Sequence, residues 1–198
     1  MVDINDLKIS YERISKYLVE TPILTSNKLD KQFEANIFLK NEVEQLTGSF
    51  KIRGALSALS HLKNQGVKGV VAFSSGNHAQ GVSKAAQIFD MKAIIVMPKD
   101  APKNKIEKTK GNGAEVVLYE RHVQSREEIA EQIAKEKDYP LVRPFDNPQI
   151  ISGQGSFGLE ACEFFLANDV KPDIVLSCTS GGGLVAVSYT HLTLPTKA

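Results

Sequence analysis

Apolar and polar positions alternate along this chain in a way that predicts strands and helices in turn. Residues 70–73 and 93–97 are short, continuous apolar runs, which is typical of buried strands. Between them Val82, Ala85 and Ala86 recur at helical spacing and predict a helix with one buried face. Regular alternation of this kind indicates an α/β architecture with a parallel sheet.

The remaining segments follow the same alternation. The first helix is expected to present Leu7, Tyr11, Ile14 and Leu18 on one face and to end before Pro22. Further strands are expected at residues 36–42, 115–119, 141–142 and 173–178. Further helices are expected at 49–64 with Ser49 as its cap, at 102–110, at 125–137 with Ser125 as its cap, and from Asn147 onward.

The composition excludes several classes of protein. An apolar content of 42%, a charged content of 24% and a net charge of +1 are ordinary for a soluble globular chain and favour neither nucleic acid nor membrane. No apolar run approaches the roughly 20 residues of a membrane helix, and the N-terminus has no signal-peptide pattern. Cys162 and Cys178 lack metal-ligand spacing, so we expect a cytoplasmic protein with reduced thiols and no metal site.

A basic run in the middle of the chain is interpreted as a solvated helix face. Nucleic-acid binding would call for interleaved aromatic residues or a basic domain, and this segment has neither. The run consists of Lys99, Lys103, Lys105, Lys108 and Lys110.

Lys51 is the first candidate for chemistry. It is expected in the first turn of a helix, where the macrodipole disfavours positive charge and lowers the pKa of an amine. Arg53, also cationic, is expected to act in the same direction. A lysine with a lowered pKa is a nucleophile that forms imines with aldehydes, although most lysines are simply solvated.

A polar loop and a glycine-rich loop complete the set of candidates. The first follows the strand at 70–73, and the carboxyl ends of parallel strands are where α/β sheets bind ligands; simple helix capping is the alternative. The second follows the strand at 173–178, where glycines let backbone N–H groups surround a phosphate. The loops consist of Ser74, Ser75, Gly76, Asn77 and His78, and of Ser180, Gly181, Gly182, Gly183 and Leu184.

These three segments together resemble fold-type II pyridoxal phosphate enzymes, whose fold is similar to that of tryptophan synthase β. Thr-Gly-Ser-Phe-Lys-Ile-Arg-Gly-Ala around Lys51 and Ser-Ser-Gly-Asn-His-Ala-Gln-Gly from Ser74 are most similar to threonine/serine dehydratases and serine racemases. The resemblance implies that Lys51 carries the cofactor as a Schiff base and then moves the Cα proton. Phe50 would lie against the cofactor ring, and Asn77 would bond its 3′-oxygen.

The resemblance assigns the remaining candidates to substrate and phosphate. The loop from Ser74 to His78 would bind the α-carboxylate of an amino-acid substrate, and Ser75 matches the serine that protonates Cα from the opposite face in racemases. The loop from Ser180 to Leu184 would bind the phosphate, with Ser180 in place of the usual first glycine. His78 is expected to be structural.

The resemblance also implies a division into two three-layer α/β/α domains, the larger one incomplete. The larger would combine residues 1–65 and 147–187, and the smaller would be an insert at residues 66–146. Residues 188–198 have little helical periodicity and resemble a translated sequencing adapter; we interpret them as a non-native tail, with a natural C-terminal tail as the alternative.

The expected reaction is β-elimination of L-threonine or L-serine to an α-keto acid and ammonia, by an enzyme that is likewise expected to be a homo-oligomer. Two alternatives stay open: a serine racemase of the same family, and an inactive truncated fragment or non-catalytic binding domain. The sequence does not distinguish threonine from serine or another β-hydroxy amino acid.

Overall fold

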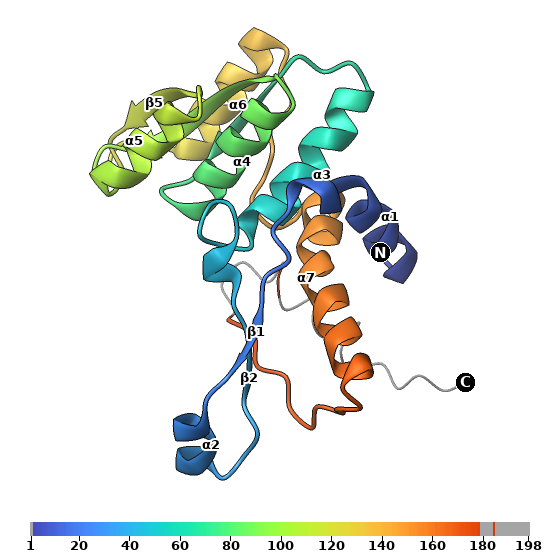
Figure 1. Cartoon of the computed structure of the whole chain (residues 1–198). Helices are drawn as coiled ribbons and strands as arrows, with labels where there is room; N and C mark the ends of the chain where they lie inside the picture. The colour runs from blue at the N-terminus through green and yellow to red at the C-terminus, as the bar shows by residue number, and fades with distance from the viewer. Residues whose placement is uncertain (1, 179–183, 185–198) are drawn as a thin grey trace.

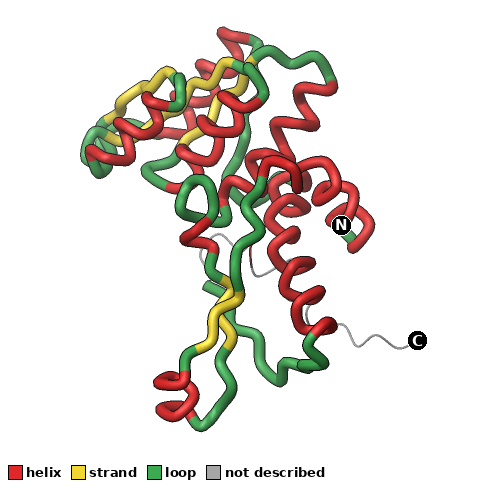
Figure 2. Tube along the Cα trace, viewed as in Figure 1, coloured by secondary structure: helices red, strands yellow, loops and turns green. Residues whose placement is uncertain are grey.

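The computed structural model describes residues 2–178 and residue 184, and the elements below belong to that part of the chain. Figure 1 shows their arrangement, and Figure 2 shows the same view by type of secondary structure. The helices are α1 (Ile4–Ile14), α2 (Asn27–Phe33), α3 (Lys51–Asn64), α4 (Asn77–Ile88), α5 (Lys103–Gly111), α6 (Arg126–Lys137) and α7 (Pro148–Ala167). The strands are β1 (Ile23–Thr25), β2 (Phe38–Lys40), β3 (Gly69–Phe73), β4 (Lys92–Pro98) and β5 (Glu115–Tyr119).

The centre of one end of the molecule is a parallel sheet in the order β3-β4-β5. Because side chains alternate along a strand, the apolar residues of this sheet supply two separate cores. Val70 and Ala72 of β3 pack with residues of α3 and α4, whereas Val71 and Phe73 pack toward α6. The result is a sheet with helices on both faces, as the alternating pattern predicted (Figure 1).

A second, two-stranded sheet forms a ribbon that leads away from this end of the molecule. Strands β1 and β2 pair antiparallel, with Ile23 opposite Lys40 and Thr25 opposite Phe38. Helix α2 lies between them in the chain and is capped by the Ser26 hydroxyl. Figure 1 shows this ribbon and α2 extending away from the parallel sheet, beside α7.

Helix α3 occupies the middle of the fold because two glycines let its neighbours approach closely. A Cβ atom placed on Gly153 of α7 would lie 2.5 Å from the Arg53 carbonyl oxygen, and one on Gly81 of α4 would lie 3.1 Å from the Lys51 carbonyl oxygen. Both distances are too short for a side chain without movement of the backbone. The first turn of α3, which carries Lys51, is therefore held against both α4 and α7.

Several elements match the sequence prediction closely. Strand β5 has the expected bounds, and β3 and β4 each differ by a residue at an end. Asn147 caps α7 by accepting hydrogen bonds from the Gln149 and Ile150 N–H groups, and Ser125 caps α6 by accepting one from the Glu128 N–H. Among the described residues, no helix is long and apolar enough to cross a membrane.

The predicted strand at residues 173–178 is wrong. No strand is present there, and Ile174 and Leu176 are exposed. The segment has strand-like residues, but no described strand lies beside it to supply hydrogen-bond partners. Cys178, expected to be a buried strand thiol, is exposed for the same reason.

The predicted strand at 141–142 is reduced to a single parallel bridge between Val71 and Leu141. The Val71 N–H donates to the Pro140 oxygen, and the Val142 N–H donates to the Val71 oxygen, after which the chain leaves the sheet toward α7. The strand expected at 36–42 is also shorter, because only β2 has a partner strand.

Two helix boundaries were predicted wrongly as well. Ser49 does not cap α3: Phe50 is already in helical conformation at the cap position, and no side chain caps this helix end. Helix α1 ends at Ile14 and continues as a 3₁₀ turn to Tyr17, so Leu18 lies beyond the helix.

The close contact between α3 and α7 gives a testable prediction. Gly153→Ala should lower the free energy of unfolding by about 1–3 kcal/mol, because its methyl group meets the Arg53 backbone. Gly158→Ala is the matched control in the same helix, since its added methyl group meets nothing within 4 Å. That control should be neutral or stabilising by about 0.5–1 kcal/mol. Urea unfolding measures both, and equal effects of the two variants would contradict the packing argument.

Candidate active site

Lys51 is the first residue of α3 and its side chain is half-buried. The ammonium nitrogen Nζ donates a hydrogen bond of 3.1 Å to the Pro144 carbonyl oxygen, on the segment that connects the parallel sheet to α7. It also lies 5.2 Å from the centroid of the Phe50 ring. The amine is therefore held at the junction of α3 with this connecting segment, with an aromatic ring beside it.

Burial lowers the pKa of the Lys51 amine below its ordinary value, as the sequence predicted. The predicted cause was partly wrong, because the Arg53 charge does not contribute. The Arg53 guanidinium is bound by the carboxylates of Glu42 and Glu160, which neutralise it. A lowered pKa increases the fraction of neutral amine at neutral pH, and the neutral form is the nucleophile.

The loop from Ser74 to Gly76 lies at the carboxyl end of β3, as predicted. The Ser74 N–H donates to the Val96 oxygen of the neighbouring strand at 3.1 Å, which ties the start of the loop to the sheet. The Ser74 hydroxyl accepts a hydrogen bond from the Gly76 N–H at 3.1 Å. Ser75 is half-buried, and α4 begins directly afterwards at Asn77.

The start of α4 and the start of α3 are in contact, which brings the two predicted segments together. Gly81 of α4 packs on the Lys51 backbone. The charge of Lys51 lowers the pKa of His78, which places these two side chains within electrostatic reach of each other. The tertiary structure thus collects Lys51, the Ser74–Gly76 loop and His78 at one edge of the parallel sheet.

His78 is fully enclosed and uncharged at neutral pH. Burial, with a smaller contribution from Lys51, lowers its pKa to about 4. Its Nε2 atom lies 3.0 Å from the Val142 carbonyl oxygen, which can only accept, so Nε2 carries the proton. Its Nδ1 atom meets no hydrogen-bond partner in the described part of the chain. A neutral, anchored imidazole agrees with the structural role expected for His78.

Asn77 is exposed, and its side chain is held by a residue that sequence reasoning missed. The Lys105 ammonium donates to the Asn77 oxygen Oδ1 at 2.9 Å and to the Gln80 oxygen Oε1 at 3.3 Å. Lys105 belongs to the basic run that was interpreted as a solvated face. Nothing in the run itself distinguishes Lys105 from its neighbours, because the signal is the packing of α5 on α4.

The predicted phosphate loop is outside the part of the chain that can be described. Ser180, Gly181, Gly182 and Gly183 fall in residues 179–183, whereas Leu184 is helical and half-buried. The tail at 188–198 also lies outside the described residues. The site geometry therefore comes from α3, the Ser74–Gly76 loop and α4.

The residues that are described fit pyridoxal phosphate. An aldehyde needs a neutral amine, and Lys51 supplies one with a lowered pKa. The buried hydroxyls of Thr47 and Ser49, in the turn that leads into Lys51, make no hydrogen bond to any residue with described coordinates. Unpartnered buried polar atoms are rare, and together with His78 Nδ1 they mark this region as one that can accept a polar ligand.

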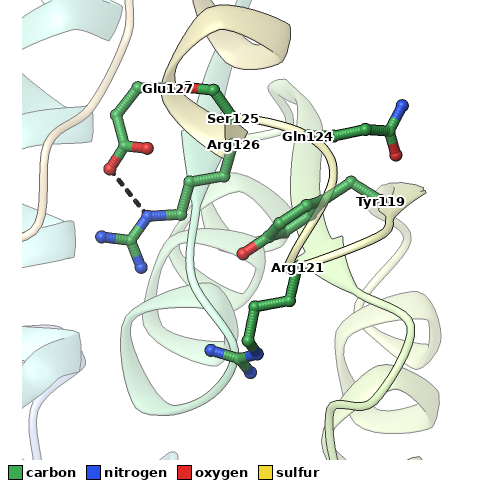
Figure 3. A pocket seen from close by; sticks show the side chains of 6 residues that line it. All are labelled: Tyr119, Arg121, Gln124, Ser125, Arg126 and Glu127. Atoms are coloured by element: carbon green, nitrogen blue, oxygen red, sulfur yellow. Dashed lines mark hydrogen bonds and ion pairs between the residues drawn. The ribbon is translucent and has the colours of Figure 1, made fainter.

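Two hollows on the surface lie apart from Lys51. One, of about 270 Å³, is lined at the end of β5 and the start of α6 (Figure 3). There the Arg126 guanidinium lies 5.1 Å from the centroid of the Phe73 ring, at the end of β3. The other, of about 390 Å³, is lined by residues of α1 and the segment after it, together with Glu160. Neither is lined by a predicted site residue.

The low pKa of His78 predicts a pH dependence of stability. Unfolded His78 takes up a proton near pH 6.5, whereas folded His78 does so only near pH 4, so stability is full above pH 6.5 and falls as the pH drops toward 4. The loss from this group alone should reach about 3 kcal/mol. His78→Gln keeps a donor for Val142 without titrating. Urea unfolding at several pH values should give a shallower slope for this variant, and parallel slopes would contradict the assignment.

Comparison with known proteins identifies the family. A family model described as pyridoxal-phosphate dependent enzyme matches residues 14–195. The chain is 41% identical over 186 residues to serine racemase of Schizosaccharomyces pombe, covering 93% of this chain and 56% of that protein. It is 40% identical over 184 residues to L-threo-3-hydroxyaspartate ammonia-lyase of Saccharomyces cerevisiae, covering 92% of this chain and 55% of that protein. The chain thus spans little more than half the length of these curated relatives.

A solved structure agrees with the sequence relatives. A threonine deaminase, whose source is given as T.th., superposes with a TM-score of 0.88 at 45% identity, covering 96% of this chain and 60% of that one. The expected fold class and cofactor are therefore confirmed. This chain belongs to the pyridoxal-phosphate dependent enzymes of fold type II, with pyridoxal phosphate as the cofactor.

Proposed function

We propose that the protein is a threonine/serine ammonia-lyase, which eliminates water from L-threonine or L-serine and yields an α-keto acid and ammonia. The observation that carries the proposal is the half-buried Lys51 amine, with its lowered pKa, next to the polar loop at the end of β3. The similar proteins are named for serine, threonine and 3-hydroxyaspartate, which are all β-hydroxy amino acids. A shared β-hydroxyl is the leaving group that β-elimination requires.

Lys51 would have two tasks in this reaction. Its neutral amine would hold the cofactor covalently in the resting enzyme, and after release it would take the proton from the substrate Cα. Pyridoxal phosphate, when bound, supplies an electron sink for the charge that develops at Cα. The Pro144 carbonyl, which accepts a hydrogen bond from Nζ, would hold the released amine in place between these tasks.

The Ser74–Gly76 loop and the start of α4 would bind the substrate α-carboxylate. N–H groups at a helix start have no partner within the helix, and they favour an anion. In α4 this end follows Gly76 and has no side-chain cap, so its N–H groups are not already used by a capping side chain. Phe50 would lie against the cofactor ring, and Ser180 to Leu184 would bind the phosphate.

A serine racemase is the second candidate, and Ser75 is the residue that favours it. A racemase needs an acid on the face of Cα opposite Lys51, and the half-buried Ser75 hydroxyl lies in the loop that would hold the substrate. Both activities are compatible with the same first proton transfer. A homo-oligomer and a two-domain division at residues 66 and 146 are part of the proposal, with the cofactor between the domains.

Covalent attachment of the cofactor tests the role of Lys51. The form to use is the longest chain that the gene encodes, because the 198 residues span 55–56% of the curated relatives. Borohydride reduction of the loaded protein followed by peptide mapping should leave the pyridoxyl group on Lys51. Lys51→Ala should lose the label and the visible absorption, whereas Lys63→Ala, an exposed lysine of the same helix, should keep both. Label on another lysine would overturn the assignment.

Substitution of Ser75 separates the two candidate reactions. With L-serine as substrate, Ser75→Ala should abolish formation of D-serine and leave appreciable release of keto acid, because only the racemase needs an acid on the second face. Chiral chromatography and a keto-acid assay measure the two products. Ser74→Ala serves as the control for damage to the loop. If neither L-threonine nor L-serine ever gives keto acid, the ammonia-lyase proposal fails.

A further inference from the structure

Lys105 joins two side-chain amides at the start of α4. Its ammonium nitrogen lies 2.9 Å from Asn77 Oδ1 and 3.3 Å from Gln80 Oε1, which are one turn apart on the helix. Lys105 is half-buried, whereas Lys103, Lys108 and Lys110 on the same helix are exposed. Within the basic run of α5, Lys105 is thus the lysine that reaches the candidate site.

The packing of α5 on α4 fixes where Lys105 can reach. Thr109, fully buried, donates its hydroxyl to the Lys105 carbonyl oxygen at 2.8 Å. Asn112, at the end of α5, donates its amide to the Ser83 hydroxyl of α4 at 2.9 Å. Because both ends of α5 are anchored in this way, the Lys105 side chain meets α4 from a defined backbone position.

An ammonium group donates hydrogen bonds and cannot accept them, so it decides how the two amides are oriented. Both amide oxygens must face Lys105, and the planar amides then direct their nitrogens away from it. The Gln80 nitrogen Nε2 is buried and makes no hydrogen bond to any described residue, so Gln80 accepts this cost to keep its oxygen on Lys105. Asn77 is exposed, so its Nδ2 donors stay accessible at the helix start.

We propose that Lys105 is a positioning residue that locks the Asn77 amide with its N–H donors presented to an oxyanion of the bound cofactor. The proposal rests on the proposed function, in which Asn77 bonds an oxygen of pyridoxal phosphate. Without Lys105 the amide can rotate and present its oxygen, which repels such a ligand atom. The lysine also adds a positive charge to the helix end that meets the ligand.

The orientation itself is tested without any ligand. In ¹⁵N NMR spectra of the chain, the side-chain amide signals of Asn77 and Gln80, assigned by substitution of each, should be displaced from solvent-exposed values. Lys105→Met should move both toward those values, and Lys105→Arg should restore much of the displacement. Lys108→Met, an exposed lysine of the same helix, should leave them in place. Unchanged signals in Lys105→Met would overturn the proposal, whether or not the chain binds a cofactor.

Titration with pyridoxal phosphate tests the consequence for the ligand. Lys105→Met should raise the dissociation constant about tenfold and displace the visible absorption maximum, while Lys108→Met leaves both unchanged and Lys105→Arg recovers most of the affinity. Asn77→Ala should abolish the difference between lysine and methionine at position 105, because the two residues act through one contact. If Lys51→Ala loses the cofactor but Lys105→Met does not alter affinity or absorption, this proposal fails while the proposed function stands. If labelling never occurs on Lys51, the proposed function fails and the NMR result still decides the orientation.

Discussion

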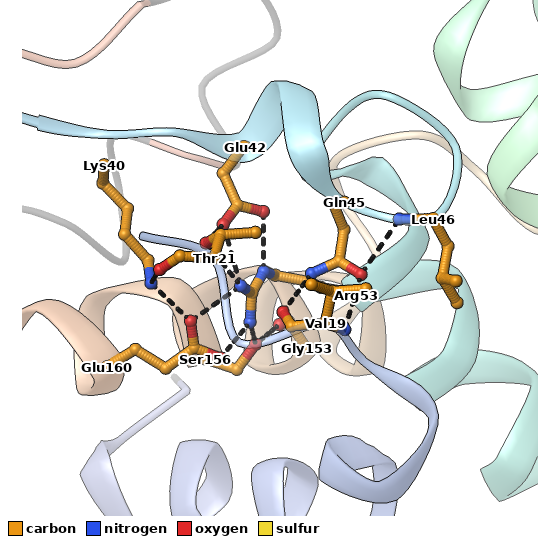
Figure 4. A network of polar contacts seen from close by, with 10 residues as sticks. All are labelled: Val19, Thr21, Lys40, Glu42, Gln45, Leu46, Arg53, Gly153, Ser156 and Glu160. Atoms are coloured by element: carbon orange, nitrogen blue, oxygen red, sulfur yellow. Dashed lines mark hydrogen bonds and ion pairs between the residues drawn. The ribbon is translucent and has the colours of Figure 1, made fainter. Parts of the chain in front are cut away.

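The arrangement of the candidate site depends on the burial of one guanidinium group. Arg53 has no exposed side-chain surface, and both Glu42 and Glu160 bind it through two oxygens at 2.7–2.8 Å (Figure 4). Lys40 donates to Glu160 at 2.6 Å, so two cations face two carboxylates and the cluster is neutral. Burial alone would lower the pKa of Arg53, but its hydrogen bonds to the carboxylates raise it above its ordinary value. Removing one member of such a buried group leaves an unpaired charge, which costs about 3–5 kcal/mol.

This cluster decides where Lys51 lies, because Arg53 is only two residues further along α3. Its partners come from the segment after β2 and from α7, so the cluster fastens α3 to both. The glycine contacts of α3 with α4 and α7 complete the enclosure of the helix start. The amine of Lys51 is then desolvated by surroundings that supply no fixed negative charge to it, and desolvation is the cause of its lowered pKa. The Arg53 cluster thus contributes to chemistry through position and through its own neutrality.

Helix α4 has a comparable role on the other side of the site. Its first turn follows the loop at the end of β3, its Gly81 packs on the Lys51 backbone, and its His78 anchors the Val142 carbonyl. The Val142 and Pro144 carbonyls belong to the same connecting segment, and Pro144 receives the Lys51 amine. A change in that segment would therefore reach His78 and Lys51 together. The polar groups of α4 at this end are held by α5 through Lys105, which extends the site beyond the residues that contain its motifs.

The sequence by itself determined the local features of this protein. Strand β5 and the helix that Asn147 caps were predicted closely, because hydrophobic periodicity and capping act over a few residues. The motif around Lys51 and the loop from Ser74 indicated the family and its cofactor, because the chemistry requires those residue types in that order. Tertiary structure decided what depends on distant partners. Arg53 and Glu160 are 107 positions apart, and Lys105 and Asn77 are 28 apart, so no local pattern could have paired them. The segment at 173–178 shows the converse, since its residues favour a strand but a strand forms only where another lies beside it to accept and donate hydrogen bonds.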